Sequence, residues 1–227
     1  MEAIVRTVGL WKTYSAGTPR EVHALQDVSL EIQEGTATVI AGPSGSGKTT
    51  LLSIIGLLST PTKGRVYFRG ASVSQISEMH RARIRRDEIG FVFQSRYLLP
   101  HLTATENVAL PLLCTDVTIS EAERLARRRL IDLGLEERLD FRVAELSGGE
   151  QQRVSIARAM VNNPSVLIAD EPSSSIDSDL TLELLDLLRQ LIVDAGLTVI
   201  VASHDPIVID WADNRFELRD GRITGRA

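Results

Sequence analysis

The 227-residue chain has little of what several classes of protein require. Its single cysteine, Cys114, excludes an internal disulfide bond and any metal site built from a cluster of cysteines, and we expect it to be a small buried apolar residue. No apolar run approaches the roughly 20 residues that a membrane-spanning helix needs, and the N-terminus lacks the long apolar core of a signal peptide. We therefore expect a cytoplasmic protein that does not insert into lipid.

The chain also lacks an excess of positive charge. Its 25 Lys and Arg residues are outnumbered by 30 Asp and Glu residues, which gives a net charge of -5. No overall field therefore draws it to nucleic acid or to an anionic membrane. The basic runs at 80–88 and 124–130 contain no interleaved aromatic residues, so we interpret both as solvated helix faces and expect no nucleic-acid partner. Membrane association would then depend on a protein partner.

Apolar residues make up 43% of the chain, which is enough for one large domain or two joined subdomains. TATVIAG at 36–42, PSVLIADEP at 164–172 and GLTVIVASHD at 196–205 are apolar runs without alternation. Such runs are typical of strands buried on both faces of a parallel sheet covered by helices. Helical patterns at 48–58 and 179–196 follow the first two runs. The fold class predicted is therefore α/β.

Two further regions accompany this α/β core. A small antiparallel β lobe is predicted by the segments at 2–14, 22–35 and 64–70. From about Thr103 to Met160 the apolar periodicity is helical, and Ser120 with Glu123 predicts a capping box at the start of one helix. We expect an inserted helical subdomain.

The segment GPSGSGKT at 42–49 matches the P-loop pattern G-x-x-x-x-G-K-[ST], between a predicted strand and a predicted helix. Its glycines permit a loop whose backbone N–H groups point at phosphate oxygens, and the helix N-terminus adds partial positive charge. Lys48 should reach the β- and γ-phosphates, and Thr49 should place its hydroxyl on magnesium. The predicted nucleotide cradle comprises Gly42, Pro43, Ser44, Gly45, Ser46, Gly47, Lys48, Thr49 and Thr50.

Two carboxylates and a histidine follow buried strands. Asp170 ends the run VLIAD and Glu171 comes next. At the edge of a strand adjacent to the P-loop strand, Asp170 would hold magnesium and Glu171 would polarise the attacking water, whereas a solvated turn is the structural alternative. His204 closes the next run and should lie at the same edge, although a lone histidine is more often structural.

A second helix start, ELSGGEQQR at 145–153, also has the features of a phosphate site. Ser147 can cap the helix, Gly148 and Gly149 leave the backbone bare, and Glu150 stands at the third helical position, as in a capping box. One chain therefore contains two anion-binding elements that are far apart in the sequence.

Together these motifs resemble the ATP-binding-cassette ATPases, over essentially the whole chain. LSGGEQQR resembles the family's signature motif, with Glu150 where glutamine is usual. The resemblance implies one P-loop nucleotide-binding domain over 1–227, with the α/β core and β lobe at about 1–95 and 160–227 and the helical subdomain at about 96–159. It also implies roles for other residues. Tyr14 would stack on adenine, with Trp11 as the alternative, and Gln94 would link the metal site to the helical subdomain. Residues 173–177 would form the D-loop, which contains Asp177, and His204 would contact the γ-phosphate.

Members of this family pair head to tail, so that each ATP lies between the P-loop of one copy and the signature helix of the other. The resemblance therefore implies a homodimer that binds ATP and Mg²⁺. Lys48 and the signature residues Ser147, Gly148 and Gly149 would stabilise charge from both sides. Thr49, Asp170 and Gln94 would surround the metal.

Two longer segments, 56–70 and 90–113, resemble a subgroup that serves lipoprotein release and macrolide efflux and includes haem-efflux and cell-division members. The permeases of this subgroup have four transmembrane helices and transmit force to the outer face of the membrane. The resemblance implies an ATPase on the cytoplasmic face of the membrane, held there by its permease. The predicted docking surface comprises Phe93, Gln94, Tyr97, Leu98 and Leu99, with a core position equally plausible for the two leucines.

Other functions stay open at this point. A cell-division type of complex would regulate an envelope enzyme and transport nothing, and the sequence does not separate it from an exporter. DNA-repair and chromosome-organising ATPases share the motifs but require a long coiled-coil insertion that this chain lacks. A P-loop kinase would have an acceptor-binding lid in place of the signature helix.

Overall fold

The computed structural model describes residues 3–174 and 176–226, so Ser175 of the predicted D-loop lies outside the described residues. Within these ranges a six-stranded sheet has the order β10-β9-β3-β8-β7-β6. The five strands other than β10 run parallel, and β10 pairs antiparallel with β9. Their bounds are β3 (Ala37–Ala41), β6 (Ile89–Val92), β7 (Val166–Asp170), β8 (Thr198–Ser203), β9 (Asn214–Arg219) and β10 (Arg222–Arg226).

The central strands are covered on both faces, as their unbroken apolar runs predict. Every residue of β3 and of β8 is buried. Alternate residues of β8 enter two hydrophobic clusters, because successive side chains point to opposite faces of a sheet. One cluster includes side chains of α6 (Ser178–Ala195), and the other includes side chains of α1 (Lys48–Ile55) and of a β lobe. A β lobe as well as a helix therefore covers the second face.

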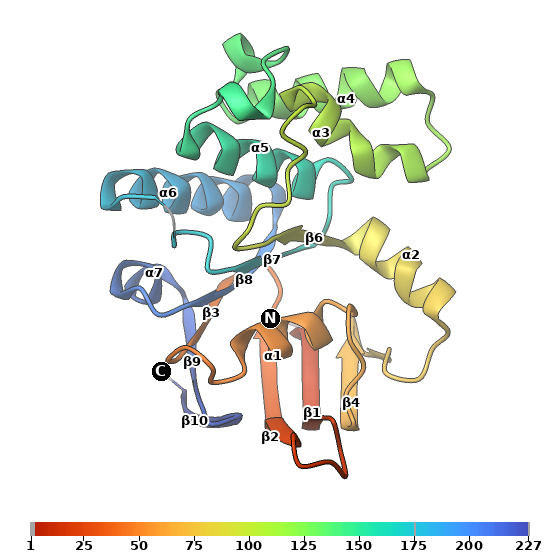
Figure 1. The fold of residues 1–227 in the computed structure, drawn as a ribbon, viewed down its shortest axis with the longest axis vertical. Coiled ribbons are helices and arrows are strands. Elements are labelled where there is room, and N and C mark those ends of the chain that lie inside the picture. Colours follow the sequence, from red (N-terminus) through yellow and green to blue (C-terminus); the bar gives the residue numbers. More distant parts are fainter. Residues whose placement is uncertain (1–2, 175, 227) are drawn as a thin grey trace.

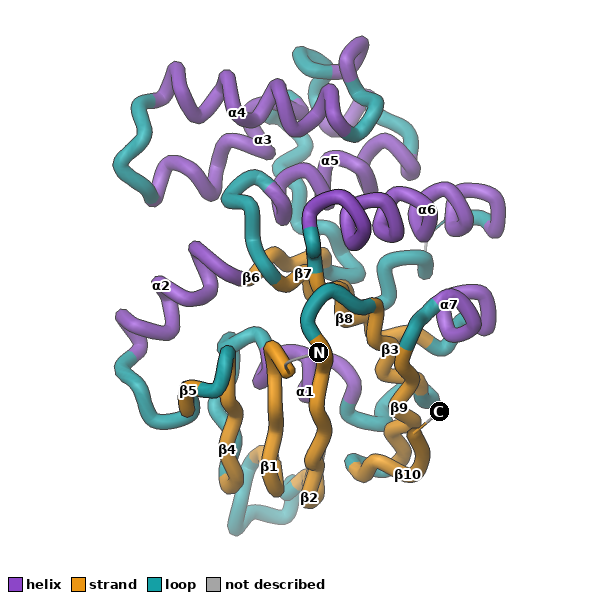
Figure 2. Tube along the Cα trace, turned by 180° about the vertical axis from the view of Figure 1, so that it is seen from behind, coloured by secondary structure: helices purple, strands orange, loops and turns teal. Residues whose placement is uncertain are grey.

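The β lobe is antiparallel, as predicted, with the strand order β2-β1-β4-β5. It lies at one end of the molecule and the helices α3, α4 and α5 lie at the opposite end, with the central sheet and α6 between them (Figures 1 and 2). The strand bounds are β1 (Ala3–Tyr14), β2 (Val22–Gln33), β4 (Lys63–Phe68) and β5 (Ala71–Ser72). The remaining helices are α2 (Glu78–Glu88), α3 (Ala104–Ala109), α4 (Ile119–Asp132), α5 (Gly148–Met160) and α7 (Pro206–Trp211), with 3₁₀ turns at Leu110–Cys114, Glu136–Arg138 and Val143–Glu145.

The start of α4 corrects one prediction. Thr118, and not Ser120, caps this helix, and its side chain accepts a hydrogen bond from the backbone N–H of Glu121. Threonine and serine hydroxyls can both accept the capping hydrogen bond, and the helix begins after the first of these two residues, Thr118, two positions earlier than predicted.

The two basic runs lie on exposed helix faces, as predicted. Every residue of α2 is at least partly exposed, and α4 buries only its apolar side, Ala122, Ala126 and Leu130.

Cys114 corrects a second prediction, because its thiol is exposed. It ends the 3₁₀ turn Leu110–Cys114, whose buried residue is Leu112. A 3₁₀ turn has three residues per turn, so Leu112 facing the core leaves Leu113 and Cys114 directed outward. The small apolar character of cysteine did not determine its environment here.

Gly90 in β6 allows the sheet to approach α5 closely. A Cβ atom at this position would lie 2.4 Å from the carbonyl oxygen of Ala159, which is a backbone atom that cannot move aside independently. We expect Gly90→Ala to lower the free energy of unfolding by about 1–3 kcal/mol, as overpacking does. Urea denaturation measures this. Gly225→Ala is the matched control, since its Cβ would meet nothing closer than 3.7 Å, and equal stability of the two variants would contradict the prediction.

None of the helices in residues 3–174 and 176–226 has both the length and the apolar character needed to cross a bilayer.

Candidate nucleotide-binding site

The P-loop lies between β3 and α1, as its sequence predicts. Gly42 follows β3, and a Cβ on it would lie 2.2 Å from the carbonyl oxygen of Leu218 in β9. Gly47 precedes α1 with φ of 105°, and a Cβ there would lie 2.5 Å from the carbonyl oxygen of Ala24 in β2. Two strands that are distant from the loop in the sequence therefore contact its backbone closely, and only glycine fits at these two positions.

A cavity of about 500 Å³ opens above this loop. It gathers residues from the ends of β6, β7 and β8 as well as from the P-loop, because the carboxyl ends of parallel strands share one edge of the sheet. The predicted residues that line it are Ser44, Gly45, Gly47, Lys48, Thr49, Thr50, Gln94, Glu171 and His204.

Lys48, Glu171 and His204 form a chain of close polar contacts in this cavity. The Lys48 ammonium lies 3.3 Å from a Glu171 carboxylate oxygen, and the His204 Nδ1 atom lies 3.0 Å from the other. Lys48 also donates hydrogen bonds to the carbonyls of Gly42 (2.8 Å) and Pro43 (3.1 Å). Its side chain is 7% exposed, so this cation is held almost out of water where the P-loop geometry places phosphate.

Glu171 has a strained backbone. Its φ of 49° is in the left-handed region, which residues other than glycine seldom adopt. The backbone N–H of Glu171 donates to the carbonyl of Ala202 in β8 at 2.9 Å, which fixes the turn. Strain of this kind gathers at functional sites, where the surrounding structure enforces it. The turn directs the carboxylate toward Lys48.

Asp170 lies farther from the P-loop strand than expected. The strand β8 lies between β3 and β7, so β7 is the second neighbour of the P-loop strand and not the adjacent one. The side chains nevertheless meet, because Thr49 donates a hydrogen bond to Asp170. Burial raises the pKa of Asp170 above its ordinary value, and the Thr49 hydrogen bond opposes this shift. Among the described residues, the Asp170 Oδ1 atom is buried and has no hydrogen-bond partner.

The remaining P-loop residue, Ser46, is buried, and its carbonyl accepts a hydrogen bond from the N–H of Gly221 at 3.0 Å.

Tyr14 ends β1 with 44% of its surface exposed, and the Lys12 ammonium lies 5.1 Å from its ring centre. In the described part of the chain, the lining of the cavity includes neither Tyr14 nor Trp11. The structure therefore does not place either candidate for adenine stacking in the lining of this cavity.

The signature residues occupy a different place. Ser147 caps α5, with its Oγ accepting from the N–H of Glu150, while Glu150 Oε2 accepts from the N–H of Ser147 at 2.8 Å. The predicted capping box is confirmed. Ser147, Gly149 and Glu150 line a groove of about 390 Å³, and none of the described residues that line it also lines the P-loop cavity. Gly148 begins the same helix.

Among the described residues that line the P-loop cavity, Asp177 is also absent. It is the N-cap of α6, where its side chain accepts a hydrogen bond from the N–H of Leu180 at 2.9 Å.

The opposite wall of the P-loop cavity contains residues that the sequence did not predict. Gln26 in β2 and the turn Asp220–Gly221 between β9 and β10 line it, together with His23. The Gln26 backbone N–H donates to the Gly221 carbonyl at 2.8 Å, and its side chain donates to the Asp220 carbonyl at 3.1 Å. The Asp-Gly dipeptide between two short apolar runs is a hairpin signal that could have indicated the turn, although not its position beside the P-loop.

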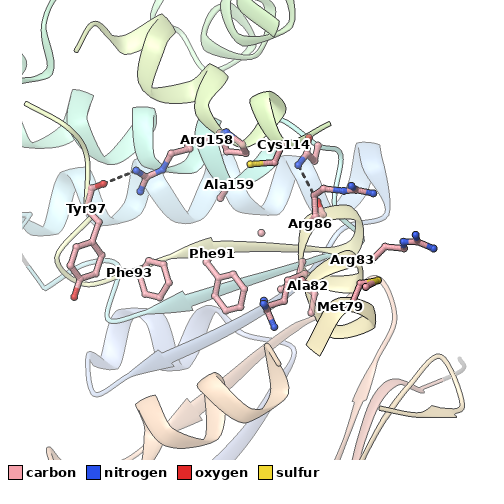
Figure 3. Close-up of a pocket in the computed structure, with 15 residues that line it drawn as sticks. Met79, Ala82, Arg83, Arg86, Phe91, Phe93, Tyr97, Cys114, Arg158 and Ala159 are labelled. Carbon is pink, nitrogen blue, oxygen red and sulfur yellow. Dashed lines mark hydrogen bonds between the residues drawn. The ribbon is translucent and has the colours of Figure 1, made fainter. Parts of the chain in front are cut away.

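A separate groove of about 790 Å³ lies between α2, β6 and α5 (Figure 3). The rings of Phe91 and Phe93 stack with their centres 5.5 Å apart, and Tyr97 meets Phe93 edge-on at the same distance. Arg158 donates to the Tyr97 carbonyl at 2.7 Å, and burial lowers the pKa of its guanidinium. Of the two leucines in the predicted docking surface, Leu98 packs against the core and Leu99 is 39% exposed.

Comparison with known proteins identifies relatives over the full length of the chain. The family model for ABC transporters matches residues 25–174. An ABC transporter ATP-binding protein of Thermotoga maritima is 45% identical over 99% of this chain and 95% of its own length. The lipoprotein-releasing system ATP-binding protein LolD 1 of Caulobacter vibrioides is 43% identical over 99% of this chain and 96% of its own. The macrolide export ATP-binding/permease protein MacB of Salmonella typhimurium is 41% identical over 98% of this chain, which spans 34% of that relative.

Solved structures agree with these relationships. An ATP-binding cassette solved as a dimer in a post-hydrolysis state with ADP and phosphate is 40% identical, with a TM-score of 0.89 over 98% of this chain and 97% of that one. The neighbour's bound products match the chemistry of a cavity built from a P-loop lysine, a glutamate and a histidine. The chain therefore belongs to the ABC transporter ATP-binding family and contains an ABC ATPase domain.

Proposed function

We propose that this chain is the ATP-hydrolysing subunit of a membrane ABC transporter and that two copies close around two ATP molecules. The observation that carries the proposal is the separation of Ser147 and Gly149 from the cavity of Lys48. Within one chain, a second anion-binding helix end has no phosphate to contact. Across a two-fold axis it completes the cage around the γ-phosphate bound by the other copy. The related cassette solved as a dimer supports this arrangement.

The roles within each composite site follow from the positions of the side chains. Lys48 binds the phosphates from one side, and Ser147 with Gly149 of the second copy binds them from the other. Glu171 orients the attacking water, and His204, within 3.0 Å of that carboxylate, contacts the γ-phosphate. Lys48 pairs with Glu171, and a bound phosphate would compete for the ammonium and free the carboxylate to orient water.

The oxygens around Asp170 fit a magnesium ion. Mg²⁺ prefers oxygen ligands, and here a buried carboxylate oxygen lacks a partner among the described atoms while the Thr49 hydroxyl contacts the same side chain. We assign Thr49 and Asp170 to the metal site, with Gln94 at its margin in the lining of the cavity. When bound, the ion would neutralise charge on the phosphates. Tyr14, exposed at the end of β1, would stack on adenine, and Asp177, at the start of α6, would face the second copy.

The aromatic groove between α2, β6 and α5 is the docking surface for the permease. Phe93 and Tyr97 line it directly after β6, next to Gln94 of the nucleotide cavity. Arg158, from the helical region at about 96–159, lines the groove opposite β6. A permease segment bound in the groove would therefore contact both the α/β core and the helical region. This seat would hold the protein at the cytoplasmic face of the membrane. The names of the LolD and MacB relatives favour a partner for lipoprotein release or macrolide export. The resemblance of segments 56–70 and 90–113 to that subgroup is the reason for proposing a permease with four transmembrane helices that transmits force.

Tyr97 offers a test of the docking surface, since 66% of it is exposed at the mouth of the groove. We expect Tyr97→Ser to lower co-purification with the permease about tenfold, because an exposed aromatic anchor commonly contributes more than 1 kcal/mol at an interface. ATP binding by the isolated protein should stay normal. Val193→Ser on α6 removes an equally exposed apolar side chain away from the groove and is the control.

The measurement is a cross-linked pull-down of tagged protein from native membranes with Mg-ATP, followed by identification of the captured proteins. A four-helix permease that is captured by the parent and by Val193→Ser, and lost with Tyr97→Ser, supports the proposal. Capture of only soluble or DNA-bound partners would overturn the transporter function and leave the ATPase chemistry intact. Stimulation of the captured complex by an envelope hydrolase alone would identify a regulatory complex that transports nothing.

A further inference from the structure

The signature motif of this chain carries a carboxylate, Glu150, whose two oxygens are both engaged. Oε2 accepts from the backbone N–H of Ser147 at 2.8 Å, and Oε1 accepts from the Nε atom of Arg138 at 2.7 Å. The Ser147 hydrogen bond is the main cause that lowers the pKa of Glu150, and Arg138 adds to it. Glu150 is therefore ionised at neutral pH.

This negative charge lies where a polyphosphate is expected. Glu150 shares its groove with Ser147 and Gly149, which face the γ-phosphate in the proposed dimer, and an anion repels an anion over this range. Glu136 and Glu137 line the same groove and add to the repulsion. The other lining cation, Arg153, is paired with Glu183 at 2.6 Å.

We propose that Arg138 is a positioning residue for ATP binding between subunits: its guanidinium neutralises Glu150 and holds the carboxylate turned back along α5, which keeps the N-terminus of the signature helix attractive to phosphate. The inference rests on the proposed closure of two copies around ATP. In this sequence Glu150 replaces the glutamine that is usual in the signature motif, and the charged partner makes that exchange compatible with phosphate binding.

A purely structural role for Arg138 is the competing explanation. Its guanidinium also lies 5.0 Å from the Phe141 ring centre and donates to the Glu137 carbonyl at 3.4 Å, so its removal could loosen the 3₁₀ turn. The two explanations differ in one respect. Neutralisation matters only while residue 150 is charged, whereas a loosened turn harms binding whatever residue 150 is.

The test therefore combines Arg138→Met with Glu150→Gln, both in the Glu171→Gln protein that traps the dimer. The readout is the ATP concentration that gives half-maximal dimer in sedimentation velocity. We expect Arg138→Met to raise this concentration about fivefold when residue 150 is Glu, within the range of coupling between contacting groups, and less than about twofold when residue 150 is Gln. Arg138→Lys, which keeps the charge, should restore most of the loss. Arg128→Met is the matched control, since Arg128 pairs with Asp132 on the exposed side of α4.

An increase of the same size in both backgrounds, or no increase in either, would overturn the inference. These outcomes are distinct from failure of the proposed function, in which the Glu171→Gln protein forms no ATP-dependent dimer at all.

Discussion

Glu171→Gln is expected to lower ATP turnover by roughly 10²–10⁴-fold, the usual contribution of a positioned general base. Glutamine has the same shape but cannot polarise the attacking water. It also removes the negative charge 3.3 Å from Lys48, so ATP binding should be retained or strengthened and the closed dimer should accumulate. Phosphate release measures the turnover, and size-exclusion chromatography with ATP measures the dimer.

Glu121→Gln is the control for this experiment, since Glu121 is a carboxylate on α4 that pairs only with a neighbouring arginine among the contacts of the described residues. It should behave as the parent protein does. Near-normal turnover in the Glu171→Gln protein would assign activation of water to another group in the cavity, of which His204 is the nearest.

Lys48→Met should nearly abolish ATP binding. The Lys48 side chain is 7% exposed, and truncating one partner of a buried charge pair costs about 2–5 kcal/mol, so the Kd for ATP should rise roughly 30-fold or more. Hydrolysis should fall below detection at ATP concentrations that saturate the parent. Isothermal titration calorimetry with ATP and magnesium measures the affinity.

Lys63→Met, at an exposed position of β4, controls for the loss of one positive charge. Glu171 keeps its contact with His204 in the Lys48→Met protein, so the fold should survive. A change in Kd smaller than about threefold would show that the backbone N–H groups of the P-loop, and not this cation, supply most of the phosphate affinity.

The parts of the site that the sequence predicted are those encoded by contiguous residues. The P-loop and the signature cap each depend on a few adjacent positions whose local conformation fixes their chemistry, and the structure places both as expected. The carboxyl-edge positions of Asp170 and His204 followed from reading buried strands correctly. The insertion of β8 between β3 and β7 could not be deduced, because the order of strands in a sheet depends on how crossovers pack and not on their order in the chain.

The wall formed by Gln26 and the turn Asp220–Gly221 could not be predicted from the sequence, for a related reason. It joins strands at opposite ends of the chain, where the hydrogen-bonded residues are separated by 194 in sequence number, and periodicity carries no information over such a separation. In the predicted docking surface, which lies within residues 93–99, a local feature of the backbone could not be predicted. Arg96 and Tyr97 have φ values of 41° and 49°, so two consecutive left-handed residues turn the chain between Phe93 and Leu98. Regular alternation cannot predict which side chains then face the groove.

The separation of the P-loop cavity from the signature groove has a consequence for how the activity of the proposed dimer would depend on the amount of protein. In that dimer each chain supplies half of every hydrolysis site, so the rate at low concentration should follow the square of the concentration, and doubling the protein should raise it roughly fourfold. A permease that seats two copies makes their encounter intramolecular, with an effective concentration of about 1 mM or more for short connections. Free copies then hydrolyse little ATP, and turnover is confined to copies that are already assembled.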